Sequence, residues 1–156
     1  MEKEDRIELL KCNIGRFDFY YGSVNFKSSF LIIANITILG FLLSNVEKLC
    51  FPVFVLNAVF IFFSILFVLF AINPYLKSVD AGNSILFFGD IASKKINVYK
   101  TNFNNVNEDK YIEDLVEQNY YLSTGLKNKF KYLNIATISF IISIICYFIQ
   151  VIYVSF

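Results

Sequence analysis

Histidine is absent from this 156-residue chain, and its absence removes several kinds of chemistry. Imidazole is the commonest general base and a frequent metal ligand, so histidine-based triads and imidazole metal sites are excluded. The three cysteines, Cys12, Cys50 and Cys146, lie far apart in the chain. Their separation argues against a disulfide framework or a thiolate metal cluster.

Other catalytic patterns are also missing. Gly82 and Gly89 stand alone, so no glycine loop cradles a phosphate, and no serine has a base partner nearby in the sequence. The carboxylates of the polar region are interpreted as a solvated face. They are Asp80, Asp90, Glu108, Asp109, Glu113, Asp114 and Glu117. We therefore expect no enzyme and no metal site.

Charge is missing from three long apolar stretches, residues 28–44, 49–72 and 133–156, which contain no Asp, Glu, Lys or Arg. A membrane-spanning helix needs about 20 predominantly apolar residues, with about 17 as the lower limit. Hydrophobic residues make up 56% of the chain, and too few polar residues remain to cover three such helices in a soluble fold. We expect a mostly α membrane protein with three transmembrane helices.

Positive charge is unevenly distributed between the polar segments. Lys and Arg number five in residues 1–27, one in residues 45–48 and eight in residues 73–132. Because positively charged flanks stay in the cytoplasm, this predicts a multi-pass inner-membrane protein with a cytoplasmic N-terminus. The first apolar stretch begins only at residue 28, so no cleaved leader is expected.

Four segments follow from this division. They are a cytosolic amphipathic N-terminal segment (1–27), a hairpin of two spans (28–72), a cytosolic region (73–132) and a third span (133–156).

Helical spacing is clearest at the two ends of the chain. Ile7, Leu10, Ile14 and Phe17 recur every three or four residues and would share one helical face. From Asn107, which can cap a first turn, no proline interrupts the chain as far as its end. We expect one continuous helix of roughly 50 residues that runs from the cytosol into the membrane.

Between the second and third spans lies the stretch ILFFGDIASKK, residues 85–95. Its apolar start at residues 85–88 suits either a short strand or a buried turn of helix, since periodicity does not separate the two. The asparagine-rich residues 97–107 are expected to form a loop.

Polar residues inside the spans form a second pattern. Ser139, Ser143 and Gln150 follow one seam of the third span together with Ala136 and Cys146. Asn35 and Asn57 lie within the first and second spans, where an amide that faces lipid is costly. Three interpretations stay open: packing within one chain, self-association into an oligomer, or a water-filled path lined by Asn35, Asn57 and Gln150.

The polar region also suits ligand binding. Aromatic residues there offer faces for stacking, and lysines offer charge for a phosphate. Core packing of the aromatics and membrane anchoring by Lys127, Lys129 and Lys131 are the simpler alternatives.

Three stretches, taken in order, resemble a known family. They are NFKSSFLIIANITILGFLLS (25–44), NSILFFGDIA (83–92) and YIEDLVEQNYYLSTGLKNKFKYLNIA (111–136). They are similar to the transmembrane effectors of Pycsar, the bacterial antiphage systems built on a pyrimidine cyclase. The loop at residues 96–107 departs from any pattern that we can match.

The resemblance implies that the cognate cyclase makes cyclic UMP or cyclic CMP on infection. The effector would sense that nucleotide in the cytosol and impair the inner membrane, which halts the infected cell. We expect no cofactor beyond this ligand and no nucleic acid polymer as a partner, and we expect a homo-oligomer in the lipid bilayer. On chemistry alone, the ligand contacts are predicted at Phe88, Asp90, Lys95, Gln118 and Tyr121.

Two functions of other classes remain as alternatives. One is a ligand-independent small pore of the holin type, against which the long polar segment argues. The other is a passive membrane anchor that recruits a soluble partner through the helix at residues 107–132.

Overall fold

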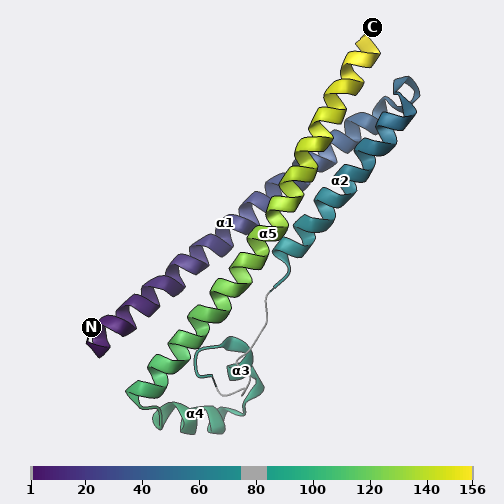
Figure 1. Ribbon diagram of the computed structural model, residues 1–156. Coiled ribbons are helices and arrows are strands. Elements are labelled where there is room, and N and C mark those ends of the chain that lie inside the picture. Colours follow the sequence, from purple (N-terminus) through teal and green to yellow (C-terminus); the bar gives the residue numbers. More distant parts are fainter. Residues whose placement is uncertain (1, 75–83, 156) are drawn as a thin grey trace. The chain divides into compact units, whose positions relative to one another are not determined.

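The computed structural model describes residues 2–74 and 84–155, and helices dominate them, with no strand in these two ranges (Figure 1). The elements are α1 (Lys3–Ser44), the short 3-10 helix η1 (Val46–Lys48), α2 (Phe51–Ile72), α3 (Phe88–Ser93), α4 (Ile96–Asn104) and α5 (Glu108–Ser155). Among the described residues, α1, α2 and α5 are long and apolar enough to cross a membrane. The expected mostly α membrane fold with three spans is confirmed.

The N-terminal segment is the first half of α1, one helix of 42 residues. Ile7, Leu10, Ile14 and Phe17 are all partly buried, which confirms that they share a face. This face packs against α5: the side-chain amide of Asn119 donates to the carbonyl of Leu10 at 3.1 Å.

Local signals set the ends of α2. Pro52 lies in its first turn, where a missing N–H costs no hydrogen bond. The helix ends at Ile72, directly before Asn73 and Pro74, because the residue before a proline avoids the helical region.

The continuous last helix is also confirmed, since α5 runs over 48 residues. The side-chain oxygen of Asn107 accepts the N–H of Lys110 at 2.8 Å and so caps its first turn. Glu108 and Asp109 follow in that turn, where negative charge suits the helix dipole.

The loop expected at residues 97–107 is wrong, because α4 covers most of it. Asparagine costs a helix only about 0.7 kcal/mol relative to alanine, so several asparagines do not prevent one. At residues 85–88, the structure shows neither a strand nor a full buried turn. Residues 85–87 are irregular, and α3 begins at Phe88.

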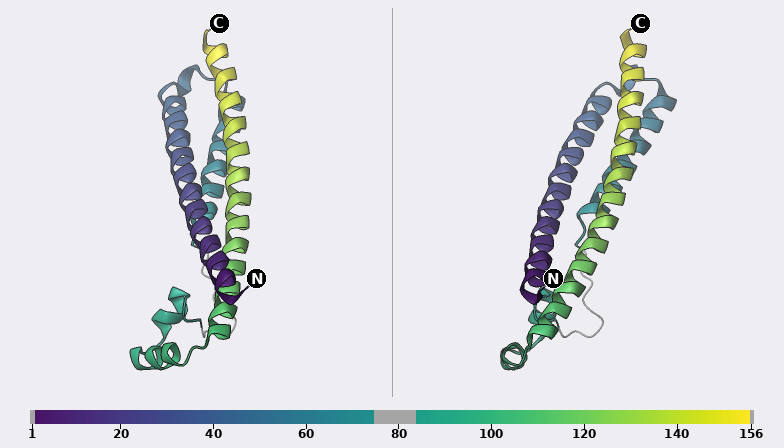
Figure 2. Two further views of the ribbon diagram at one scale, coloured as in Figure 1. Left: turned by 90° about the vertical axis from the view of Figure 1, so that its left-hand side faces the viewer. Right: turned by 60° about the vertical axis from the view of Figure 1, so that its left-hand side comes forward.

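The chain divides into two compact units. Unit 1 comprises Met1–Tyr21 and Pro74–Lys127, of which residues 75–83 lie outside the described part, and unit 2 comprises Gly22–Asn73 and Asn128–Phe156. Unit 1 therefore holds most of the polar sequence, and unit 2 holds the three apolar stretches. In unit 2 the second halves of α1 and α5 run alongside α2 (Figure 2).

Candidate functional site

Ser84 is the centre of a buried polar cluster in unit 1. Its hydroxyl donates to the Asp114 carboxylate at 2.7 Å and accepts the backbone N–H groups of Leu86 at 3.1 Å and Phe87 at 2.8 Å. The Gln118 amide also donates to this hydroxyl, at 3.3 Å. One small side chain on the irregular segment is thus bound to two turns of α5.

Two buried carboxylates complete the cluster. Asp90 is 4% exposed and accepts the backbone N–H of Ser84 at 3.0 Å, while Asp114 is 8% exposed and accepts that of Ile85 at 2.8 Å. The Lys94 ammonium donates to the Ser84 carbonyl at 3.1 Å. Hydrogen bonds to a charged group are among the stronger ones, so this network holds ILFFGDIASKK against α5.

The interpretation of the carboxylates as a solvated face is therefore wrong for Asp90 and Asp114. A signal in the sequence could have found Asp114, which lies three residues after Tyr111 and four before Gln118. Those positions share the buried face of α5. No pattern in the sequence around Ser84 indicates that it is buried or that Asp114, 30 residues later, is its partner.

The residues predicted to contact a ligand lie in different environments. Asp90 and Gln118 meet at Ser84, where both take part in the cluster. Phe88 is 64% exposed and Lys95 is also exposed, while Tyr121 is half-buried.

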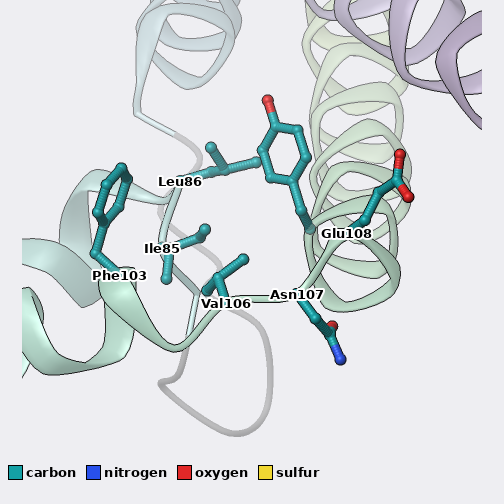
Figure 3. A pocket seen from close by; sticks show the side chains of 7 residues that line it. Ile85, Leu86, Phe103, Val106, Asn107 and Glu108 are labelled. Carbon is teal, nitrogen blue, oxygen red and sulfur yellow. The ribbon is translucent and has the colours of Figure 1, made fainter.

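A cavity of about 450 Å³ lies beside the cluster in unit 1. It is lined by Ile85, Leu86, Phe103, Val106, Asn107, Glu108 and Tyr111. Figure 3 shows the apolar side chains of Ile85, Leu86, Phe103 and Val106 around this space, with Asn107 directed away from it. None of the five residues predicted to contact a ligand lines the cavity. One lining residue, Phe103, belongs to α4, the helix that the sequence did not predict.

Cations from α1 reach two residues of the cavity wall. The Lys3 ammonium lies 2.7 Å from the Asp109 carboxylate and 3.6 Å from that of Glu108, and the hydrogen bond to Asp109 raises the pKa of Lys3. The Lys11 ammonium lies 5.7 Å from the ring centre of Tyr111. The wall thus combines aromatic faces with charges of both signs: the Glu108 carboxylate is paired with Lys3, and the Lys11 ammonium lies beside Tyr111.

The Phe87 ring occupies the space beside Gly89. A Cβ at this position would lie 2.6 Å from a ring carbon of Phe87. We expect Gly89→Ala to displace the Phe87 ring and to loosen residues 85–87 by about 0.5–1.5 kcal/mol, the usual cost of a side chain forced off its rotamer. Hydrogen exchange at the Phe87 amide measures the effect. Ala92→Ser, which adds one atom at an exposed position of the same helix, is the control, and equal exchange in both variants would contradict the packing argument.

Unit 2 contains a regular series of polar contacts between α2 and α5, which lie side by side in Figure 1. The Ser64 hydroxyl donates to the Ala136 carbonyl at 3.0 Å. Seven residues further along α5 and seven back along α2, the Ser143 hydroxyl donates to Asn57 at 2.7 Å.

The same spacing of seven residues gives a polar contact at each end of α2. Beyond Ser143, Gln150 accepts the backbone N–H of Cys50 at 3.1 Å and donates to its carbonyl at 3.0 Å. In the opposite direction, the Lys129 ammonium donates to the carbonyls of Ala71 at 2.6 Å and Asn73 at 2.8 Å. Every heptad of this antiparallel pair therefore holds a polar contact.

The third helix of unit 2 joins the series through Asn35, whose amide donates to Ser64 at 2.9 Å. Among the described residues of unit 2, three fully buried polar atoms have no hydrogen-bond partner: the Ser28 hydroxyl, the Asn35 side-chain oxygen and the Asn57 side-chain nitrogen. Ser139 is buried on the same helix as Ser143. The predicted membrane residues thus point into the unit that one chain forms.

The described residues contain no group of three or more Cys, Asp or Glu side chains that could hold a metal ion. Around its cavity, the described part of unit 1 has aromatic faces, buried polar groups and nearby lysines, a combination that is typical of small-molecule sites.

Comparison with known proteins identifies the family. The family model of the Pycsar effector protein domain matches residues 9–156. No curated protein and no solved structure matches the chain. The matched family is not a known enzyme family. Since the match covers nearly the whole sequence, the chain belongs to the Pycsar effector family and is a membrane protein of antiphage defence.

Proposed function

We propose that this effector senses a cyclic mononucleotide, cyclic UMP or cyclic CMP, through unit 1. Binding then impairs the inner membrane through unit 2 and arrests the infected cell. The N-terminus and unit 1 are cytoplasmic in this proposal, because the lysines and arginines are concentrated there. The cognate pyrimidine cyclase supplies the ligand.

The observation that carries the proposal is the extent of α5. Its first turn lines the cavity through Glu108 and Tyr111, and its second and third turns bind Ser84 through Asp114 and Gln118. The same helix provides Ser143 to the polar contacts of unit 2. A ligand that favours one arrangement of unit 1 therefore acts on a helix that also builds unit 2, and shifts its population of states.

The cavity is the site that we propose for the nucleotide. Its volume of about 450 Å³ lies in the range of small-molecule pockets. Phe103 and Tyr111 offer faces on which a pyrimidine base stacks, and Lys11 lies close enough to Tyr111 to meet a phosphate. In this arrangement Asp90 and Gln118 position the wall by holding Ser84, while Phe88 and Lys95 lie outside the cavity lining.

Calorimetric titration of the full chain in detergent, with cyclic UMP, cyclic CMP, cyclic AMP and cyclic GMP, tests the sensing step. We expect saturable binding of one pyrimidine nucleotide. Phe103→Ala should weaken it at least fivefold, because stacking on one aromatic ring is worth about 1–3 kcal/mol per base. Val98→Ala is the matched control, since Val98 is an exposed residue of α4 that does not line the cavity.

Other outcomes separate the alternatives. If Phe88→Ala and Lys95→Ala lost nucleotide binding while Phe103→Ala kept it, the site would lie at the residues predicted from sequence. No binding of any nucleotide by the folded protein would overturn sensing. If expression then killed cells that lack a cyclase, the ligand-independent pore would replace it.

A further inference from the structure

We propose that the polar contacts of unit 2 are the closed form of an aqueous path, and that Asn35, Asn57, Ser64 and Ser143 line this path when the effector is activated. The permeant class is water with small hydrated ions. The inference rests on the proposed function for its trigger, but its argument comes from the core of unit 2 alone.

The first argument is the incomplete pairing of these side chains. Asn35 and Asn57 are fully buried, yet one polar atom of each has no hydrogen-bond partner, and the Ser28 hydroxyl also has none. A buried polar group without a partner destabilises the state that contains it, and lipid supplies no water to replace the partner. Apolar side chains in place of both members of each contact would cost the closed unit little, so the amides are better explained by a second state in which they serve.

The second argument is their alignment. Ser28 and Asn35 on α1, Asn57 and Ser64 on α2, and Ser143 and Gln150 on α5 are each seven residues apart. Seven residues are two helical turns, or about 10.5 Å, so each helix carries its polar groups on one line. Isolated polar contacts would fix the packing equally well, whereas rows on three helices are what a path through the membrane requires.

The third argument is chemical. The rows consist of neutral amides and hydroxyls, and the apolar stretches contain no charged residue. In the closed unit these groups bind one another: Asn35 donates to Ser64, and Ser143 to Asn57. Once the helices part, water replaces those partners at little cost, because both hydroxyls and amides exchange hydrogen bonds with water. The four lining side chains are neutral and so select little by charge, and the charge of the series is the Lys129 ammonium at the C-terminal end of α2.

Asn57→Leu and Asn35→Leu test the inference in vesicles that contain the full chain. We expect each variant to remain folded and to bind nucleotide like the unaltered protein. Nucleotide-dependent ion leakage should nevertheless fall at least tenfold. Thr37→Val is the control, since Thr37 is an exposed residue of the same helix as Asn35, and its leakage should not change.

A charge introduced at position 57 tests the path separately from packing, because ion selectivity does not depend on how the helices pack in the closed unit. Asn57→Asp should make the conductance prefer cations, seen as a shift of the reversal potential in a salt gradient. Leakage that persists in both leucine variants, with nucleotide binding intact and no shift for Asn57→Asp, overturns the path and leaves sensing unaffected. Absence of any nucleotide-dependent leakage from the unaltered protein overturns the proposed membrane damage, and the path with it.

Discussion

Asp114→Ala is expected to release residues 84–87 from α5 and to lower the free energy of local opening there by about 3 kcal/mol or more. The carboxylate accepts the Ser84 hydroxyl at 2.7 Å and the Ile85 N–H at 2.8 Å. Each hydrogen bond to a charged group contributes about 1.5–3 kcal/mol, and removal of the acceptor leaves both donors buried. The loss therefore exceeds that of a typical surface substitution.

Hydrogen exchange at the Ile85 amide measures this opening, because exchange reports local unfolding without requiring the whole protein to unfold. Glu113→Ala is the matched control: it removes the same charge one residue earlier, at an exposed position. Ile85 and Leu86 line the cavity. In Asp114→Ala, both the protection of the Ile85 amide against exchange and the affinity for nucleotide should therefore fall, whereas neither should fall in the control. Unchanged protection at Ile85 would show that the cluster does not hold this segment.

The second large effect is expected for Lys129→Met. Lys129 is 6% exposed, and its ammonium donates to the carbonyls of Ala71 and Asn73 at the C-terminal end of α2. Positive charge at this end of a helix also complements the helix dipole. Methionine keeps most of the side-chain volume and removes the donors. We therefore expect the free energy of unfolding of unit 2 to fall by about 2–3 kcal/mol.

Lys131→Met separates this contact from membrane anchoring. Lys131 is exposed, lies two residues further along α5 and carries the same charge. If the lysines at 127–131 served only as a positive flank, both variants would behave alike. We expect denaturant unfolding in detergent to be shifted by Lys129→Met alone, with faster exchange in the last turn of α2.

Sequence and structure agree best where a feature depends on neighbours in the chain. The lengths of the charge-free stretches determine that three helices can span a bilayer, because the hydrocarbon thickness sets the number of residues needed. The end of α2 at Asn73 and Pro74 and the start of α5 after Asn107 follow from backbone geometry and one side-chain cap. Composition does not predict α4, because an asparagine-rich segment is typical of a loop although each asparagine costs a helix little.

The candidate site itself needed the tertiary structure. Ser84 and Asp114 are 30 residues apart, and Asn57 and Ser143 are 86 apart, so nothing local identifies them as partners. Pairing between helices depends on their register, and a shift of one residue would turn other side chains inward. The sequence alone thus determined which segments can enter a membrane and that amide side chains lie within them. Only the packing of α1, α2 and α5 decided which amides meet and which polar atoms stay unpaired, because a hydrogen bond requires two groups to lie within about 3 Å of each other.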